Sequence, residues 1–149
     1  MFGPAAGAMV TDGNGRYLLQ RRSDDGTWGI LGGGTEIGES IVENAIREVL
    51  EESGLQIRIV RLLSIATGDD CSGEYPNGDK GKFWGFLFLG EVTGSTQIEW
   101  NEETLELRWF TYEDIEKLEN KSLYLEHNFD NIKNVDVRIL AKVIQKKIS

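Results

Sequence analysis

The sequence contains little of several residue types, and each shortage narrows what the chain can be. Cys71 is its single cysteine, so no disulfide can form within the chain. No apolar run approaches the roughly 18 residues of a membrane-spanning helix. Residues 1–6 have neither the basic region nor the long apolar run of a signal peptide. We therefore expect a cytoplasmic protein without a disulfide framework or a membrane anchor.

Positive charge and histidine are scarce as well. The chain has 16 Lys and Arg against 25 Asp and Glu, which gives a net charge of −9. A chain of this charge repels a long polyanion, so binding of long nucleic acid is disfavoured, and a small anionic substrate must be drawn by local cations. His127 is the only histidine and no motif accompanies it, so we assign it no role.

The residues that are present suit one globular domain. The chain has 149 residues, of which 40% are hydrophobic and 28% charged. This length allows a sizeable core but leaves no room for a second domain. We therefore expect residues 1–149 to form a single domain.

Hydrophobic patterning predicts strands interspersed with helices. The expected strands are 7–10, 17–21, 57–63, 83–92 and 105–111, and the expected helices are 41–53, 112–118 and 132–144. The turn signal at 12–15 predicts a hairpin, and Asn77-Gly78 predicts another. The almost wholly apolar segment 83–92 should be a central strand. A mixed sheet with helices on both faces, an α/β fold, is the economical arrangement.

The helix expected at 41–53 has clear signals at both ends. Ser40 and Glu43 form a capping box, and Gly54 supplies the left-handed residue that ends the helix. At about 100° per residue, one arc of this helix is apolar. Its members are Val42, Ala45, Ile46, Val49 and Leu50. A run of glycines, 32–34, precedes the helix and predicts a tight loop that approaches a ligand closely.

Three glutamates, Glu48, Glu51 and Glu52, are expected on the opposite arc. Like charges at these spacings cost a few tenths of a kcal/mol per pair. A divalent cation would turn the repulsion into attraction, because hard ions such as Mg²⁺ take carboxylate oxygens and keep waters and phosphates as further ligands. Without their neighbours, the three glutamates fit a solvated acidic face equally well.

The neighbours of these glutamates complete a longer pattern, G-x5-E-x7-R-E-U-x-E-E-x-G-U, in which U is aliphatic. The matching residues are Gly33, Glu39, Arg47, Glu48, Val49, Glu51, Glu52, Gly54 and Leu55. Its seven fixed identities would coincide by chance in about one sequence in a million. The chain therefore resembles the Nudix hydrolase family, including its MutT-like and ADP-ribose pyrophosphatase-like members. The flanking segments 18–22, 28–30 and 107–110 also resemble the family. Leu31, by contrast, stands where the family usually has proline.

The resemblance implies a Nudix-type α/β/α sandwich and cleavage of a pyrophosphate link in a nucleoside diphosphate joined to another group. It implies Mg²⁺, with Mn²⁺ as the alternative. The implied metal ligands are Glu48, Glu51, Glu52 and a backbone carbonyl near Gly32. By the same resemblance, Arg47 orients a ligand glutamate, with a surface ion pair as the alternative, and Glu39 holds the loop or that arginine in place.

The resemblance leaves the general base open. Members of the family use either a glutamate of the motif or one on a later loop, so Glu52 competes with Glu102 and Glu103. For Glu102 and Glu103, an ordinary acidic loop is the simpler interpretation.

Substrate contacts are the least determined feature of the sequence. Arg21 and Arg22 end a strand near the glycines and suit phosphate binding, but they could instead pair with Asp24 or Asp25. Segment 75–79 could cover the site or form an ordinary hairpin tip. Trp28, Trp84, Trp100 and Trp109 could stack on a base, although core packing is commoner.

Three functions fit these observations. The first is a pyrophosphatase of a small nucleotide derivative, with ADP-ribose or a nucleotide sugar ahead of a (d)NTP removed from the nucleotide pool. The second is a Nudix-fold sensor that binds a nucleotide without cleaving it, but such sensors commonly lose the motif glutamates, which this chain keeps. The third, an acidic interaction domain, leaves the motif unexplained. The sequence leaves open whether the protein forms a homodimer.

Overall fold

The computed structural model describes residues 2–67, 73–74, 80–133 and 138–141. Along the chain its elements are β1 (Phe2–Thr11), β2 (Arg16–Arg22), β3 (Trp28–Gly29), β4 (Leu31–Gly34), α1 (Ile41–Ser53), β5 (Ile57–Thr67), β6 (Gly73–Glu74), β7 (Lys80–Val92), β8 (Thr104–Thr111), α2 (Tyr112–Lys117), α3 (Leu123–Asn128), the 3-10 helix η2 (Phe129–Lys133) and β9 (Arg138–Ala141). In the described part of the chain, no helix is long and apolar enough to cross a membrane.

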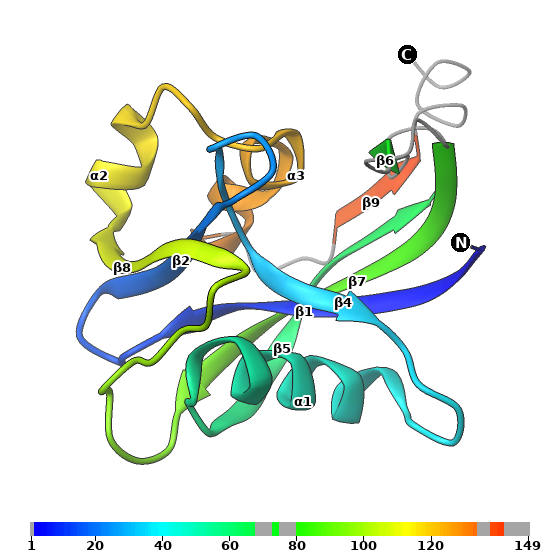
Figure 1. The fold of residues 1–149 in the computed structure, drawn as a ribbon, viewed down its shortest axis with the longest axis horizontal. Coiled ribbons are helices and arrows are strands. Elements are labelled where there is room, and N and C mark those ends of the chain that lie inside the picture. The colour runs from blue at the N-terminus through cyan, green and yellow to red at the C-terminus, as the bar shows by residue number, and fades with distance from the viewer. Residues whose placement is uncertain (1, 68–72, 75–79, 134–137, 142–149) are drawn as a thin grey trace.

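The strands form a mixed sheet in which β7 is central (Figure 1). The main path runs β3-β2-β1-β7-β5-β9, while β4 pairs with β1, β8 with β2 and β6 with β7. Strand β1 is parallel to β7 and antiparallel to β2 and β4. The mixed sheet, the first hairpin and the central position of β7 confirm the predictions from the sequence.

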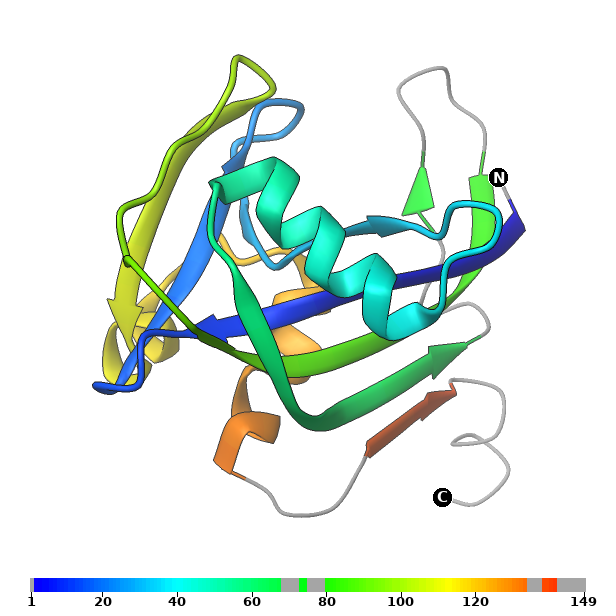
Figure 2. The same cartoon turned by 90° about the horizontal axis from the view of Figure 1, so that it is seen from below.

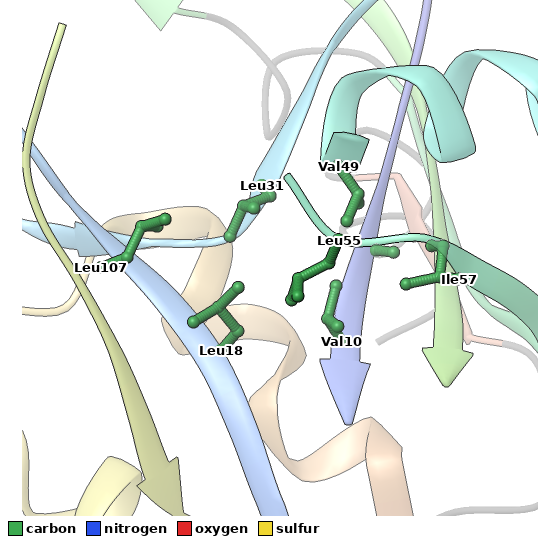
Figure 3. Close-up of a cluster of buried hydrophobic side chains, with 8 residues drawn as sticks. Val10, Leu18, Leu31, Val49, Leu55, Ile57 and Leu107 are labelled. Carbon is green, nitrogen blue, oxygen red and sulfur yellow. The ribbon is translucent and has the colours of Figure 1, made fainter. Parts of the chain in front are cut away.

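Helices cover both faces of the sheet, with α1 on one side and α2 and α3 on the other (Figure 2). Successive strand residues alternate between the two cores, as the pleat requires. Val10 and Leu18 pack with Val49 of α1, in the cluster that Figure 3 shows. Their neighbours Met9 and Leu19 pack on the opposite face in a second cluster. The predicted α/β/α arrangement is therefore present.

The prediction of a helix over 132–144 was wrong at 138–141, whereas 132–133 end the 3-10 helix η2 and the other residues lie outside the described part. Residues Arg138–Ala141 form β9, which pairs in parallel with β5 and places Ile139 beside Ile65. Pairing at the sheet edge satisfies the backbone groups of both strands, and this outweighs a helical pattern of apolar residues. The helix α3 was not predicted, although Ser122 caps it by accepting the N–H of Leu125 at 3.2 Å.

The glycine run is a strand, not the loop that the sequence predicts. Gly32, Gly33 and Gly34 belong to β4 and pair with residues 5–7 of β1. A Cβ on Gly32 would lie 2.7 Å from the Cα of Gly7, so the two strands can meet this closely only because neither residue has a side chain. The predicted turn at Asn77-Gly78 lies outside the described residues.

Candidate active site

Helix α1 begins and ends where the sequence predicts. The Ser40 side chain accepts the N–H of Glu43 at 3.1 Å, and Glu43 Oε1 accepts the N–H of Ser40 at 3.1 Å. Gly54 has φ +76° and donates its N–H to the carbonyl of Leu50 at 2.8 Å. A cap of this kind contributes about 1 kcal/mol. Both ends of the helix that carries the motif are therefore fixed by local contacts.

The helix is rotated relative to the predicted arcs. Its buried residues are Asn44, Ala45, Val49 and Ser53, whereas Val42 and Leu50, expected in the core, are exposed. At about 100° per residue, Glu48 and Glu52 fall between Asn44 and Ala45, so they share the side of the helix that packs. The side chain of Glu48 is 16% exposed and that of Glu51 is 57% exposed. Only Glu51 therefore faces solvent as predicted.

The glycines of β4 make room for the two partly buried carboxylates of Glu48 and Glu52. A Cβ on Gly33 would lie 2.5 Å from Glu48 Oε1, so any other residue there would collide with that carboxylate. Gly32 donates its N–H to Glu52 Oε1 at 2.9 Å. Because the glycines of β4 have no side chains, the backbone of β4 lies directly against this part of α1. This contact between distant segments explains why the predicted arcs were wrong.

Arg47 connects the remaining motif residues. Its Nε and Nη2 donate to the two oxygens of Glu39 at 2.6 and 3.0 Å. Its Nη1 donates to Glu48 at 3.0 Å and to Glu51 at 3.1 Å, and its Nη2 also reaches the carbonyl of Gly34 at 2.9 Å. Charge-assisted, bidentate bonds of this kind combine strength with directional control. The contacts support the predicted orienting role of Arg47, which stays a prediction.

Burial and neighbouring charges perturb the acidity of the site. Burial, followed by the charge of Glu48, raises the pKa of Glu52 to about 8, although hydrogen bonds from the Gly32 N–H and the Gln20 side chain oppose the shift. Burial also raises the pKa of Glu48, against the effect of Arg47. Hydrogen bonds from Arg47 hold the pKa of Glu39 below its ordinary value. Burial therefore disfavours the ionised form of both Glu48 and Glu52, although Arg47 pairs with Glu48.

The donor set fits a hard divalent cation. Among the described residues, no three His, Cys, Asp or Glu side chains are already arranged around a common metal position. Arg47 engages Glu48 and Glu51, and the Gly32 N–H engages Glu52. Oxygen ligands on adjacent helical turns are those that Mg²⁺ prefers, and a cation would stabilise the ionised form that burial disfavours. Glu48, Glu51 and Glu52, with the Gly32 backbone, supply oxygen ligands of the kind that such an ion takes, once their side chains turn toward a common point.

Two cavities meet near Glu52, which lines one of them; Glu48 and Glu51 line neither. The polar cavity has a volume of about 260 Å³ and the apolar cavity about 410 Å³. The polar cavity is lined by Gln20, Arg22, Ser23, Asp24, Gly32, Glu52, Asn101, Glu103 and Thr104. The apolar cavity is lined by residues 4–7, 29–34 and 85–86 together with Arg22, Ser122 and Tyr124. Arg22 and Gly32 line both cavities and therefore mark their junction.

The structure distinguishes between the adjacent candidates that the sequence treats alike, Arg21 and Arg22 for phosphate and Glu102 and Glu103 for the base. Arg22 lines both cavities and forms a bidentate pair with Asp24, at 3.1 and 2.8 Å. Arg21 donates to the carbonyl of Gly26 at 3.3 Å and lines neither cavity. Glu103 lines the polar cavity, whereas Glu102 does not. The geometry thus favours Arg22 over Arg21 and Glu103 over Glu102.

Trp28, Trp100 and Trp109, the tryptophans whose side chains the structure describes, line neither cavity. Trp28 is buried against Phe110, Trp109 is partly buried and Trp100 is exposed. The side chain of Trp84 and segment 75–79 lie outside the described residues. Sequence reasoning missed Gln20 and Tyr124 as lining residues. Strand alternation could have found Gln20, because it lies two residues before Arg22 on the same face.

Comparison with known proteins gives one family match, one similar relative and two similar structures. The family model for the NUDIX domain matches residues 1–129. Nucleoside triphosphatase NudI of Escherichia coli (strain K12) is 33% identical over 109 residues, which are 68% of this chain and 77% of NudI. The MutT protein of Methanosarcina mazei Go1 has a TM-score of 0.71 and 24% identity, over 91% of this chain and 96% of that chain. An ADP-ribose pyrophosphatase of Streptococcus suis 89-1591 has a TM-score of 0.65 and 21% identity, with the same coverage of 91% and 96%.

Proposed function

The chain belongs to the Nudix family of pyrophosphohydrolases, and on that premise we propose that it hydrolyses the pyrophosphate bond of a small nucleotide with Mg²⁺ or Mn²⁺. The observation that carries this proposal is the junction of the two cavities at Arg22 and Gly32. A nucleotide has one apolar part and one strongly anionic part. A bipartite site with carboxylates and an arginine at the polar end matches that division.

The apolar cavity would take the nucleoside. Phe86 and Tyr124 supply aromatic surface, and the glycines of β4 and Gly85 leave backbone exposed to a flat base. The diphosphate would then lie at the junction, where the Arg22 guanidinium can exchange Asp24 for phosphate oxygens. This placement brings the scissile bond beside Glu52.

Glu48, Glu51 and Glu52, with the carbonyl of Gly32, are the proposed metal ligands. A bound divalent ion would neutralise charge that builds on the phosphate oxygens and lower the pKa of a bound water. Arg47 and Glu39 would keep the carboxylates in position. In hydrolysis, the oxygen of water bonds to phosphorus while the bond from that phosphorus to the bridging oxygen breaks.

Two glutamates remain as candidates for the base that accepts the proton of the attacking water. Glu52 and Glu103 line the same polar cavity, and Glu102 lies outside it. The position of Glu103 supports keeping it beside Glu52 as a candidate. Comparing Glu52→Gln, Glu103→Gln and Glu102→Gln in one activity assay would distinguish them.

A nucleoside triphosphate is our first candidate substrate, because the curated relative at 33% identity is a nucleoside triphosphatase. The motif alone favours ADP-ribose or a nucleotide sugar, which we keep as the second candidate. The likeness to an ADP-ribose pyrophosphatase, at 21% identity, concerns the fold. Both classes contain the pyrophosphate bond that the site is proposed to cleave.

The test is a substrate panel with Mg²⁺ or Mn²⁺, read by chromatography. It should include (d)NTPs, oxidised (d)NTPs, ADP-ribose, nucleotide sugars, dinucleoside polyphosphates and capped RNA. We expect a nucleoside monophosphate from at least one class, and loss of at least about two orders of magnitude in Glu52→Gln. The exposed Glu119→Gln change is the matched control. Thermal stabilisation by a nucleotide without any product would instead indicate a sensor.

A further inference from the structure

Gln20 is anchored at both ends of its side-chain amide within the polar cavity. Its Nε2 donates to the carbonyl of Ile30 at 3.3 Å, and its Oε1 accepts from the hydroxyl of Thr104 at 3.3 Å. Glu52 lines the same cavity, and the Gln20 side chain acts to lower the pKa of its carboxyl. An amide has two N–H donors and one carbonyl oxygen, so one N–H of Gln20 is left for the Glu52 carboxylate. Gln20 therefore links β2 to the approach to β4 and the start of β8, beside the end of α1.

We propose that Gln20 is a positioning residue for the hydrolytic reaction, holding Glu52 and the segment that carries Glu103 at a fixed separation. The inference rests on the proposed function of this site. Glu52 accepts the N–H of Gly32 at 2.9 Å and lines the same cavity as Gln20, whose second amide N–H is left to orient its carboxylate. Thr104 directly follows Glu103, and both line the cavity with Gln20. One amide thus sets the relative position of the two candidate bases.

The fold itself does not need this amide. Strand β2 already pairs through its backbone with β3, where Gln20 lies opposite Gly29, and with β8, where it lies opposite Leu107. The end of α1 is joined to the segment before β8 by the N–H of Glu99, which donates to the carbonyl of Ser53 at 2.9 Å. These bonds remain when the side chain is changed. The amide is therefore available for control of the site.

The test compares Gln20→Met with Gln56→Met, the same change at an exposed position between α1 and β5. Mn²⁺ binding is measured by electron paramagnetic resonance, and hydrolysis is measured on the best substrate of the panel. We expect Gln20→Met to weaken Mn²⁺ binding about tenfold and to lower kcat about 10- to 100-fold, as loss of a residue that orients metal ligands does. KM should change less than about threefold, because the residue orients reacting groups and does not bind the nucleoside.

Thr104 gives a second pair of variants. Thr104→Val removes the hydroxyl that donates a hydrogen bond to Gln20 Oε1, whereas Thr104→Ser keeps that hydroxyl. We expect Val to lower kcat and Ser to restore it, with similar thermal midpoints. This pair keeps the proposal testable if Gln20→Met does not fold.

Unchanged Mn²⁺ affinity and kcat in Gln20→Met, with or without a lower thermal midpoint, would overturn the inference. So would equal kcat in the two Thr104 variants. If the wild-type protein itself bound no Mn²⁺, the proposed function would fail and the inference with it. A wild type that binds the ion and a Gln20→Met variant that binds it equally well would refute the inference alone.

Discussion

Glu52→Gln should stabilise the metal-free protein while it destroys activity. Burial, followed by the charge of Glu48, raises the pKa of Glu52 from 4.5 to about 8. Glutamine keeps an oxygen that can accept the Gly32 N–H, but it carries no charge. The variant therefore removes the cost of ionising a buried carboxyl and leaves the surrounding contacts in place.

The pH dependence of this effect follows from the direction of the shift. Below about pH 4.5 the carboxyl is protonated in both the folded and the unfolded state, and the glutamine of the variant gives no advantage over it. Between pH 4.5 and 8 only the folded state holds the proton, so the free energy of unfolding of the wild type falls as pH rises. The full pKa shift sets an upper limit of about 5 kcal/mol on the free energy of unfolding that the wild type loses in this way. Since Glu52 borders a cavity that admits water, we expect about 1–3 kcal/mol at about pH 8.5.

The assay is urea unfolding in the presence of a chelator, at about pH 5 and about pH 8.5. Glu51→Gln, on the same helix but 57% exposed, is the control and should change the free energy of unfolding by less than about 1 kcal/mol. At the higher pH, added Mg²⁺ should stabilise the wild type more than Glu52→Gln, because only the wild type has the complete set of ligands. A Glu52→Gln variant no more stable than the wild type at the higher pH, or a difference that does not change with pH, would refute the reasoning.

Three further changes test separate parts of the site. Gly33→Ala places a methyl group against Glu48, so Mn²⁺ affinity in electron paramagnetic resonance should fall about tenfold, and an unaltered affinity would contradict the fit. Arg22→Ala should raise KM about tenfold in steady-state assays with a smaller effect on kcat, whereas a change in kcat alone would exclude phosphate binding. Ser40→Ala should lower the free energy of unfolding by about 1 kcal/mol in urea with kcat unchanged, and a stability equal to the wild type would show that the cap contributes nothing.

The sequence predicts best those features that depend on neighbouring residues. The capping box of Ser40 and Glu43 and the left-handed Gly54 set the ends of α1 without help from the rest of the chain. The first hairpin is equally local, because its turn lies between the strands that it joins. Local signals were therefore enough to place these elements.

Features that depend on distant segments were predicted less well. Helical spacing alone put Val42 and Leu50 in the core, because nothing in α1 shows that the glycines of β4 leave room for Glu48 and Glu52. The same limit applies to β9, whose partner β5 lies far earlier in the chain. In both cases the competing contact was absent from the local pattern.

The candidate site divides in the same way. The spacing of Glu39, Arg47 and Glu48 brings them together on one helix and its preceding turn, and the structure joins them by hydrogen bonds. Gln20 and Tyr124 reach the two cavities from other elements, and neither has a fixed spacing to the motif. The motif therefore predicts the metal-binding half of the site, whereas the folded chain is needed to define the substrate half.

The central claim is that Glu48, Glu51 and Glu52 bind a divalent cation that acts on a diphosphate. The most direct measurement is a crystal structure with Mg²⁺ and a non-hydrolysable nucleotide. We expect the ion on these carboxylates, the diphosphate beside Arg22 and the base in the apolar cavity. Three glutamate side chains turned into bulk water, with no ion among them in the presence of saturating Mg²⁺, would contradict the account.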